Sequence, residues 1–443
     1  MTNRACWIRV ALAGVWLTVA AVRANADEIG LFALTGVYNT NNALRSSAQP
    51  RSDTVAYFTL ASYGKWETGR LRTSWGVAEE GIKYFNGSFG SKLYPSASVH
   101  AEYNAIPDFM SWRLGDVAGQ VLVTPSKPDT PLNRANFNVF STGPAFHIPV
   151  SRNLWVGAEG MYSNTYYEKQ TLNGNKVDSA LGLNRNLGHK TDVGLYVGQS
   201  EGNYKAFGRF KTENAALRFR GEGAFTSIKA EAGLNRSVKP VMTGDLPFFD
   251  IDLQRRFHDS SSLQMKLQRK ITNPSEQFGQ IAGTGGGETA IHGGGGAADV
   301  PNNLGLFDSR LARVAYETKR RRTEVRVGLY YRKEDSLPGA SIVEHRRIEG
   351  IDGMYHLIYG SKTGIVAYGS YEIHHGELFA GRVNRELVLG TEIAKPIWTV
   401  ATRWVVTIEH RRRIGNDSFD NYREWRIGAY LRFSKFVYGR EIG

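Results

Sequence analysis

The stretch Tyr422-Arg-Glu-Trp-Arg-Ile-Gly-Ala-Tyr-Leu-Arg-Phe433 divides into two alternating sets of residues. The apolar set is Trp425, Ile427, Ala429, Leu431 and Phe433, and the polar set is Glu424, Arg426, Gly428, Tyr430 and Arg432. Successive side chains of a β-strand point to opposite faces. The stretch is therefore predicted to be a strand with one apolar face and one charged face.

The same alternation recurs along most of the chain, whereas amphipathic helical patterns are nearly lacking. The clearest repeats cover residues 249–256, 263–270, 324–332 and 398–411. Hydrophobic residues make up 41% of the 443, with 49 Gly, 21 Tyr and 21 Phe, a mixture that suits strands, turns and an interfacial aromatic girdle. After the N-terminus no apolar run reaches the length of a transmembrane helix. The pattern predicts an all-β fold with roughly 18 antiparallel strands, within a range of about 16 to 20.

Residues 1–26 have the features of a secretory signal peptide. Arg4 and Arg9 supply its charged start, Val10–Val22 its short apolar core, and Ala24-Asn-Ala26 its cleavage site. The single cysteine, Cys6, lies within this segment, so the mature chain is expected to have no disulfide and no thiolate-bound metal. No cofactor is expected.

Export makes a transmembrane β-barrel of the bacterial outer membrane the favoured fold, with a soluble exported β-protein as the alternative. In lipid every backbone N–H and C=O must be paired internally, which forces a sheet to close. The strands are evenly spaced over the whole mature length, and their polar faces carry many Arg and Lys. We expect the barrel to span residues 27–433, followed by a tail at 434–443. The last strand is predicted to end at Phe433 or Phe436 and to pair with the strand near residues 30–37.

Three short segments resemble a known family. Tyr38-Asn-Thr-Asn-Asn42, the segment from Asn136-Phe to Ser141-Thr-Gly-Pro144, and Asn273-Pro-Ser-Glu276 are similar to the outer-membrane β-barrel family encoded with exopolysaccharide loci and the PEP-CTERM sorting system. The resemblance implies a role in moving an exopolysaccharide across the outer membrane, or in placing it there. It also implies periplasmic export components as partners.

The net charge of +13 indicates an anionic partner, either lipopolysaccharide or an acidic polymer, because export argues against nucleic acid. Inward-facing charged positions are candidates to line the lumen. The basic candidates are Arg256, Lys266, Arg326, Arg403, Arg426 and Arg432, and the acidic candidates are Asp250, Asp252, Glu324, Glu409 and Glu424. The clusters Lys319–Arg322 and Arg411–Arg413 are instead predicted to lie at turns or strand ends, in contact with lipid phosphates or solvent.

Catalysis and metal binding are disfavoured by the pattern. Paired carboxylates hydrolyse glycosides only at a set separation, and the inward acids are more simply explained as partners of inward arginines. His374 and His375 are adjacent on a predicted strand and should face opposite sides, so a shared metal is not expected. The Gly-rich stretch 283–296 lacks the spacing of a phosphate-binding loop. It belongs to a long connection at 273–303, a candidate lid over the pore.

Four functions remain open at this stage. The first is a passive conduit for an acidic exopolysaccharide, and the second is a general or anion-selective porin for small solutes. The third is a membrane-embedded enzyme, which we do not expect. The fourth is a scaffold of the polysaccharide machinery that conducts nothing.

Overall fold

A computed structural model describes residues 28–123, 127–169, 173–188, 190–205, 208–239, 245–258, 260–272, 307–337, 345–360, 362–376, 382–397, 401–416 and 421–438. The predicted signal peptide and the connection at 273–303 lie outside these ranges. Among the described residues, no helix is long and apolar enough to cross a membrane.

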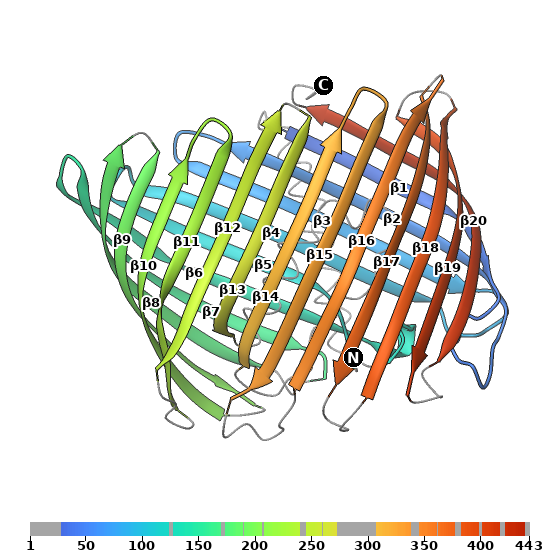
Figure 1. The fold of residues 1–443 in the computed structure, drawn as a ribbon, viewed down its shortest axis with the longest axis horizontal. Helices are drawn as coiled ribbons and strands as arrows, with labels where there is room; N and C mark the ends of the chain where they lie inside the picture. The colour runs from blue at the N-terminus through green and yellow to red at the C-terminus, as the bar shows by residue number, and fades with distance from the viewer. Residues whose placement is uncertain are drawn as a thin grey trace.

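Twenty strands form one antiparallel sheet in the described parts of the chain (Figure 1). They are β1 (Glu28–Thr40), β2 (Asp53–Glu67), β3 (Leu71–Tyr84), β4 (Lys92–Ile106), β5 (Met110–Leu122), β6 (Arg134–Ser151), β7 (Leu154–Tyr167), β8 (Gly174–Gly188), β9 (Thr191–Tyr204), β10 (Gly208–Glu222), β11 (Thr226–Lys239), β12 (Leu246–His258), β13 (Ser261–Thr272), β14 (Phe307–Lys319), β15 (Thr323–Ser336), β16 (His345–Tyr359), β17 (Thr363–Gly376), β18 (Arg382–Pro396), β19 (Thr402–Gly415) and β20 (Tyr422–Tyr438). A single 3₁₀ turn, η1 (Pro131–Asn133), precedes β6.

Each strand pairs with its neighbours in sequence, and β1 pairs with β20, so the sheet closes into a barrel. Closure places Tyr38 opposite Gly428 and Thr40 opposite Arg426. The predicted pairing of the first and last strands is thus confirmed. The predicted end of the last strand is wrong, because β20 continues past Phe433 and Phe436 to Tyr438, where it pairs with Ile29.

The strand number lies at the upper limit of the predicted range. Some strands alternate weakly in sequence, which explains the lower central estimate. In β16, Gly350 and Gly353 replace side chains that would mark a face, and β8 carries several Asn and Gly. Closure supplies these strands with backbone partners on both sides, so their weak side-chain pattern does not prevent pairing.

The two rims of the barrel differ in the length of their connections. Every connection from an even-numbered strand to the next odd-numbered one is two to five residues long, such as Arg152–Asn153 between β6 and β7. On the opposite rim lie the long connections 41–52, 123–133 and 273–306. Short turns face the periplasm in outer-membrane barrels, and longer loops face outward. The long-connection rim, at the bottom of Figure 1, is therefore the extracellular rim.

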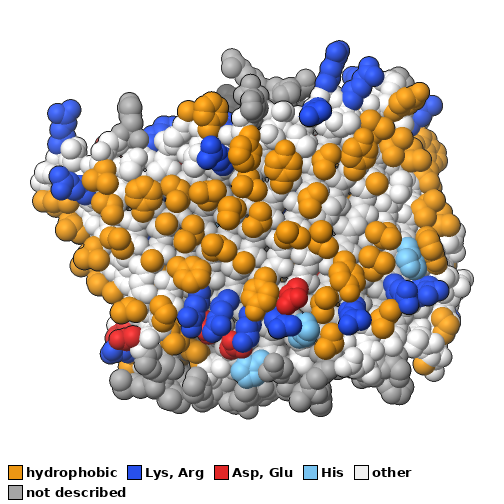
Figure 2. All heavy atoms as spheres, in the orientation of Figure 1, with side chains coloured by type: hydrophobic (Ala, Val, Ile, Leu, Met, Phe, Trp, Pro, Cys, Tyr) orange, Lys and Arg blue, Asp and Glu red, His pale blue; other side chains and the backbone are white. Residues whose placement is uncertain are grey.

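The outer wall is apolar, and the inner wall carries charged side chains together with an apolar cluster that includes Phe32, Leu34 and Val55 on β1 and β2. On β20, Trp425 is 47% exposed and Ile427 56%, whereas Glu424 on the inner face is 1% exposed. Figure 2 shows the same division from outside, with apolar side chains covering the broad middle of the wall. A closed sheet with this arrangement satisfies its backbone internally and presents hydrocarbon-like surface to lipid. The chain is an integral β-barrel of the outer membrane.

Candidate functional site

The inner wall of β18, β19 and β20 carries a dense group of arginines and glutamates. We call it the arginine cluster. Its members are Arg45, Arg403, Arg411, Arg413, Arg426, Arg432, Glu386, Glu392, Glu409 and Glu424. Strand alternation sends every second residue of these strands inward, which is why the strand members share one parity on each strand.

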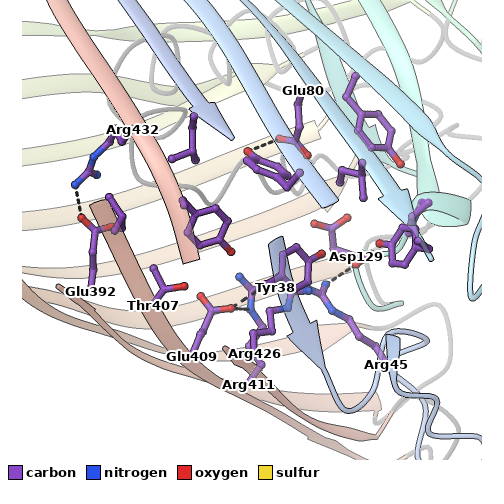
Figure 3. A pocket seen from close by; sticks show the side chains of 18 of the residues that line it. Tyr38, Arg45, Glu80, Asp129, Glu392, Thr407, Glu409, Arg411, Arg426 and Arg432 are labelled. Atoms are coloured by element: carbon purple, nitrogen blue, oxygen red, sulfur yellow. Dashed lines mark hydrogen bonds and ion pairs between the residues drawn. The ribbon is translucent and has the colours of Figure 1, made fainter. Parts of the chain in front are cut away.

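Arg426 lies at the centre of this group. Its Nε atom is 2.7 Å from Oε1 of Glu424, and its Nη1 atom is 3.9 Å from Oε1 of Glu409. Arg411 donates to the same Glu409 at 2.6 Å (Figure 3). The guanidinium group also lies over the ring of Tyr38, 5.2 Å from its centroid. Charge-assisted bonds of this kind fix the direction of each side chain.

Arg403 and Arg432 form a second, less balanced part of the cluster. They are direct cross-strand partners on the inner face of β19 and β20. Arg432 donates to Oε1 of Glu392 at 2.5 Å (Figure 3). Two like charges placed directly opposite each other repel. Glu392 is the carboxylate partner of Arg432, and Arg403 lies directly opposite Arg432, so this part of the wall carries more positive than negative charge.

The first long connection reaches into the lumen and attaches to this cluster. Arg45 lies at 5% exposure with its Nε atom 3.0 Å from Oε2 of Glu424. Asn42 donates to the carbonyl of Arg423 at 3.1 Å, and Arg45 also donates to the carbonyl of Asp129. The connections 41–52 and 123–133 thus meet each other inside the barrel.

Asp129 fastens the second of these connections. It receives two hydrogen bonds from Arg134, at 2.7 and 2.9 Å, and Arg134 also lies 3.6 Å from Glu80. Burial acts to raise the pKa of Asp129, but the charges of Arg134 and Arg45 outweigh it and hold that pKa below its usual range. Asp129 is therefore ionised at neutral pH.

Tyrosines complete the cavity beside the cluster. Tyr38, Tyr57, Tyr84, Tyr94, Tyr368 and Tyr430 line the same space as Arg45, Arg134, Arg411, Arg426 and Arg432. Tyr368 donates to Glu409 at 3.0 Å and Tyr57 to Glu80 at 3.3 Å. The cavity therefore combines guanidinium groups, phenolic hydroxyls and flat ring surfaces.

Of the residues predicted to line the lumen, five lie in this cluster. They are Arg403, Glu409, Glu424, Arg426 and Arg432, all on the inner face as expected. The other six also belong to inward-facing positions, but on distant parts of the wall. Asp250 accepts a hydrogen bond from Gln268 at 2.6 Å, and Asp252 lies opposite Lys266 on the next strand. Arg256 donates a hydrogen bond to the carbonyl of Ala224. Glu324 lies 4.0 Å from His356, and Arg326 is opposite Met354.

Arg411–Arg413 lies close to the extracellular end of β19, in accord with the predicted strand end, but two of its three side chains do not face lipid or solvent as predicted. The triplet lies within β19, where Arg411 and Arg413 face the lumen and Arg412 faces outward. Trp404 is 54% exposed and so faces outward, and counting alternate residues along β19 from Trp404 places Arg412 outward and Arg411 and Arg413 inward. Lys319–Arg322 does lie at the end of β14 and in the following turn, as predicted.

Arg45 and Asp129 were not identified from sequence. Both belong to connections, and connections carry no alternation from which an inward direction can be read. His374 and His375 do face opposite sides, with His374 bonded to Glu372 at 2.8 Å and His375 to Arg347 at 3.1 Å. Among the described residues, no group of three or more His, Cys, Asp or Glu side chains is placed to hold a metal ion.

Comparison with known proteins returns solved structures only. No protein-family model matches the chain, and no curated protein sequence matches it. Similar structures include OccAB3 of Acinetobacter baumannii, at 10% identity and TM-score 0.36 over 92% of this chain and 99% of that one.

Two further matches come from Pseudomonas aeruginosa. OpdK with vanillate matches at 10% identity and TM-score 0.38, over 92% of this chain and 98% of that one. OccK2 (OpdF) in complex with glucuronate matches at 9% identity and TM-score 0.37, over 93% and 98%. At these scores the likeness carries no argument about function, which has to rest on the side chains described above.

Proposed function

We propose that the barrel is a porin-like channel that lets small hydrophilic solutes cross the outer membrane and favours anions. A barrel of 16 strands or more leaves an aqueous lumen when loops do not plug it. The inner wall described above is polar and charged, so water and ions are better solvated there than in lipid. No chemical step is required of any residue.

The excess of arginine in the cluster is the observation that carries this proposal. Six arginines are set against four glutamates, and Arg403 lies opposite Arg432, which pairs with Glu392. In a narrow, low-dielectric passage, fixed charge of one sign concentrates ions of the other sign. Ion pairing keeps each individual site weak, which allows a bound anion to leave again.

The meeting of the two inward connections supports small solutes as the cargo. Arg45 and Asp129 are both held by buried ion pairs at the extracellular half of the lumen. These contacts place rigid side chains across part of the passage. A solute that binds carboxylate-first would meet Arg45, Arg411 and Arg426 in succession along the wall.

Planar-bilayer recording tests this function. Under a salt gradient the reversal potential should show anion preference, and Arg403→Gln/Arg432→Gln should reduce that preference by about half or more. The matched control is Arg385→Gln/Arg412→Gln, which removes the same charge from the lipid-facing side. The absence of any conductance, including after removal of residues 273–303, would contradict a channel of either selectivity.

A second candidate, a conduit for an acidic exopolysaccharide, is favoured by the tyrosines in the same cavity. Tyr38, Tyr84 and Tyr94 supply flat surfaces beside Arg45 and Arg134. Aromatic rings pack against sugar faces while guanidinium groups bind uronic carboxylates. Block of the single-channel current by an acidic oligosaccharide, but not by a neutral one of equal length, would support this candidate. A non-conducting scaffold would show neither current nor block.

A further inference from the structure

Eight consecutive strands carry a basic residue on their outward face near the extracellular rim. We call these residues the basic row. They are Arg269 on β13, Arg310 on β14, Lys333 on β15, Arg347 on β16, His375 on β17, Arg385 on β18, Arg412 on β19 and Arg423 on β20. Each belongs to the same outward parity as the apolar, lipid-facing residues of its own strand.

The strand register places these residues side by side. Arg269 is opposite Arg310, Arg310 is opposite Lys333, Lys333 is opposite Arg347, and Arg347 is opposite His375. Arg412 and Arg423 are likewise direct partners. Neighbouring strands lie about 4.8 Å apart. Five aligned bases therefore form a continuous strip on the order of 20 Å long.

Carboxylates hold one half of the row in place. Asp308 accepts from Arg269 at 3.0 Å and from Arg310 at 2.7 Å. Asp335 contacts Lys333 at 3.1 Å and His345 at 2.9 Å. Glu349 lies 3.0 Å from Arg347, and Asp335 also lies 3.8 Å from Arg310. Three carboxylates thus face four Arg and Lys side chains and His375 in this half of the row. They orient the basic groups and leave a small positive excess.

The other half of the row is more open. Arg385, Arg412 and Arg423 are exposed on the outer face. Within the part of the chain that the structure describes, no carboxylate lies at ion-pair distance from any of the three. Like charges facing each other, as Arg412 and Arg423 do, are unfavourable without a counter-ion. These guanidinium groups are therefore placed to receive an external anion.

The row marks the extracellular edge of the lipid-facing surface. On β15 the outward positions Val325, Val327, Leu329 and Tyr331 precede Lys333. In Figure 2 the charged side chains form a band directly below the apolar field, toward the extracellular rim. An Arg or Lys on the lipid face is strongly unfavourable at the bilayer midplane and close to neutral near the interface. The row therefore lies at the level of the head groups.

We propose that the basic row binds the phosphates of lipopolysaccharide in the outer leaflet. Planar guanidinium groups donate paired hydrogen bonds to phosphate oxygens, and a strip of them fits the two phosphates of a lipid A head group. On β13–β17 the outward residues near the periplasmic turns carry no charge, as in Leu263, Val325 and Ile365, whereas β18 and β20 carry Lys395 and Lys435 there. The proposal does not depend on whether the barrel conducts.

Native mass spectrometry of the purified, folded barrel with bisphosphorylated lipid A tests the proposal. The variant Arg385→Gln/Arg412→Gln/Arg423→Gln should bind this lipid at least about tenfold more weakly, since each basic side chain contributes separately to attraction of an anionic head group. The control Arg320→Gln/Arg321→Gln/Arg322→Gln removes the same charge from the exposed periplasmic turn between β14 and β15 and should bind as the unmodified barrel does.

A second arm needs no variant. The unmodified barrel should bind dephosphorylated lipid A at least about tenfold more weakly than the bisphosphorylated form. Phosphatidylglycerol, with one phosphate, should also bind more weakly. Equal binding of phosphorylated and dephosphorylated lipid A, an equal loss in both triple variants, or phosphatidylglycerol binding as tightly as lipid A would each overturn the proposal.

Discussion

The Nε atom of Arg45 lies 3.0 Å from Oε2 of Glu424, so the first long connection is fastened to the last strand across 379 positions of sequence. Thr40 donates to the other oxygen of the same carboxylate at 2.8 Å. Glu424 therefore receives bonds from the end of β1, from the connection that follows it and, through Arg426, from β20 itself. The seam of the barrel is held by side chains as well as by backbone pairing.

Removing this carboxylate charge should destabilise the barrel. Arg45 and Glu424 are 5% and 1% exposed, and breaking a buried pair leaves an uncompensated charge. We expect Glu424→Gln to lower the free energy of unfolding by about 3 kcal/mol. Urea unfolding in phospholipid vesicles, followed by tryptophan fluorescence, measures the change. The matched control Arg72→Gln breaks an exposed pair with Glu67 and should cost less than about 0.5 kcal/mol. Equal costs for the two variants would refute the role of burial.

Acid should release the second inward connection. The pKa of Asp129 is lower in the folded barrel than in the unfolded chain, where it is about 3.9. Its ionised form therefore stabilises the fold above that pH, and the stabilisation disappears as the pH falls through the folded pKa. Asp129→Asn should be less stable than the unmodified barrel at pH 7, and the difference should shrink below pH 4. A difference that stays constant with pH would contradict the assignment.

Removing Glu392 should act on selectivity in the direction opposite to removing the arginines. Glu392 is the carboxylate bonded to Arg432, and Arg403 lies beside that pair. Glu392→Gln leaves both guanidinium groups without it, so the anion preference measured from the reversal potential should rise. Glu324→Gln, which removes an acid from the distant wall of β15, serves as the control and should change the preference less. An unchanged preference would show that this part of the wall does not face the permeation path, and a fall would contradict the predicted direction.

Two strands approach each other closely at Gly143, so a larger residue there should destabilise the barrel. A Cβ atom added at Gly143 would lie 1.9 Å from the carbonyl oxygen of Gly160, and a backbone atom cannot move away cheaply. Gly143→Ala should destabilise the barrel by about 1–3 kcal/mol, as overpacking does. A Cβ at Gly160 itself meets nothing within 4 Å. Gly160→Ala should be neutral or slightly stabilising. Unfolding midpoints in urea compare the two.

Alternation, together with the predicted signal peptide, the even spacing of the strands and their basic polar faces, predicted the barrel, and alternation gave the inward direction of its charged residues. Arg426, Arg432 and Glu409 were placed on the correct face because a period of two is enough to assign faces once the apolar set is known. Their partners were not predictable. Glu392 lies two strands away from Arg432 in the sheet, and no local pattern reports which inward residues share a level across strands.

The connections between strands were predicted less well than the strands themselves. Arg45 lies in a polar segment that sequence alone describes only as a link between strands, yet the structure buries it in the lumen. For the run Arg411–Arg413 the predicted position at a strand end is correct, but the lumen-facing direction of Arg411 and Arg413 follows only from continuing the parity of Trp404 along β19. The same parity sends Arg412 outward into the basic row.

Closure by β1 and β20 means that the first and last strands to be synthesised complete the ring together. A chain cut short before β20 would leave β1 and β19 with unpaired backbone edges, which in water invite aggregation and in lipid are not tolerated. It would also lack Glu424, and with it the anchor of Arg45. The seam therefore ties closure of the ring to the presence of β20, because without that strand the sheet keeps two open edges and Arg45 loses its carboxylate partner.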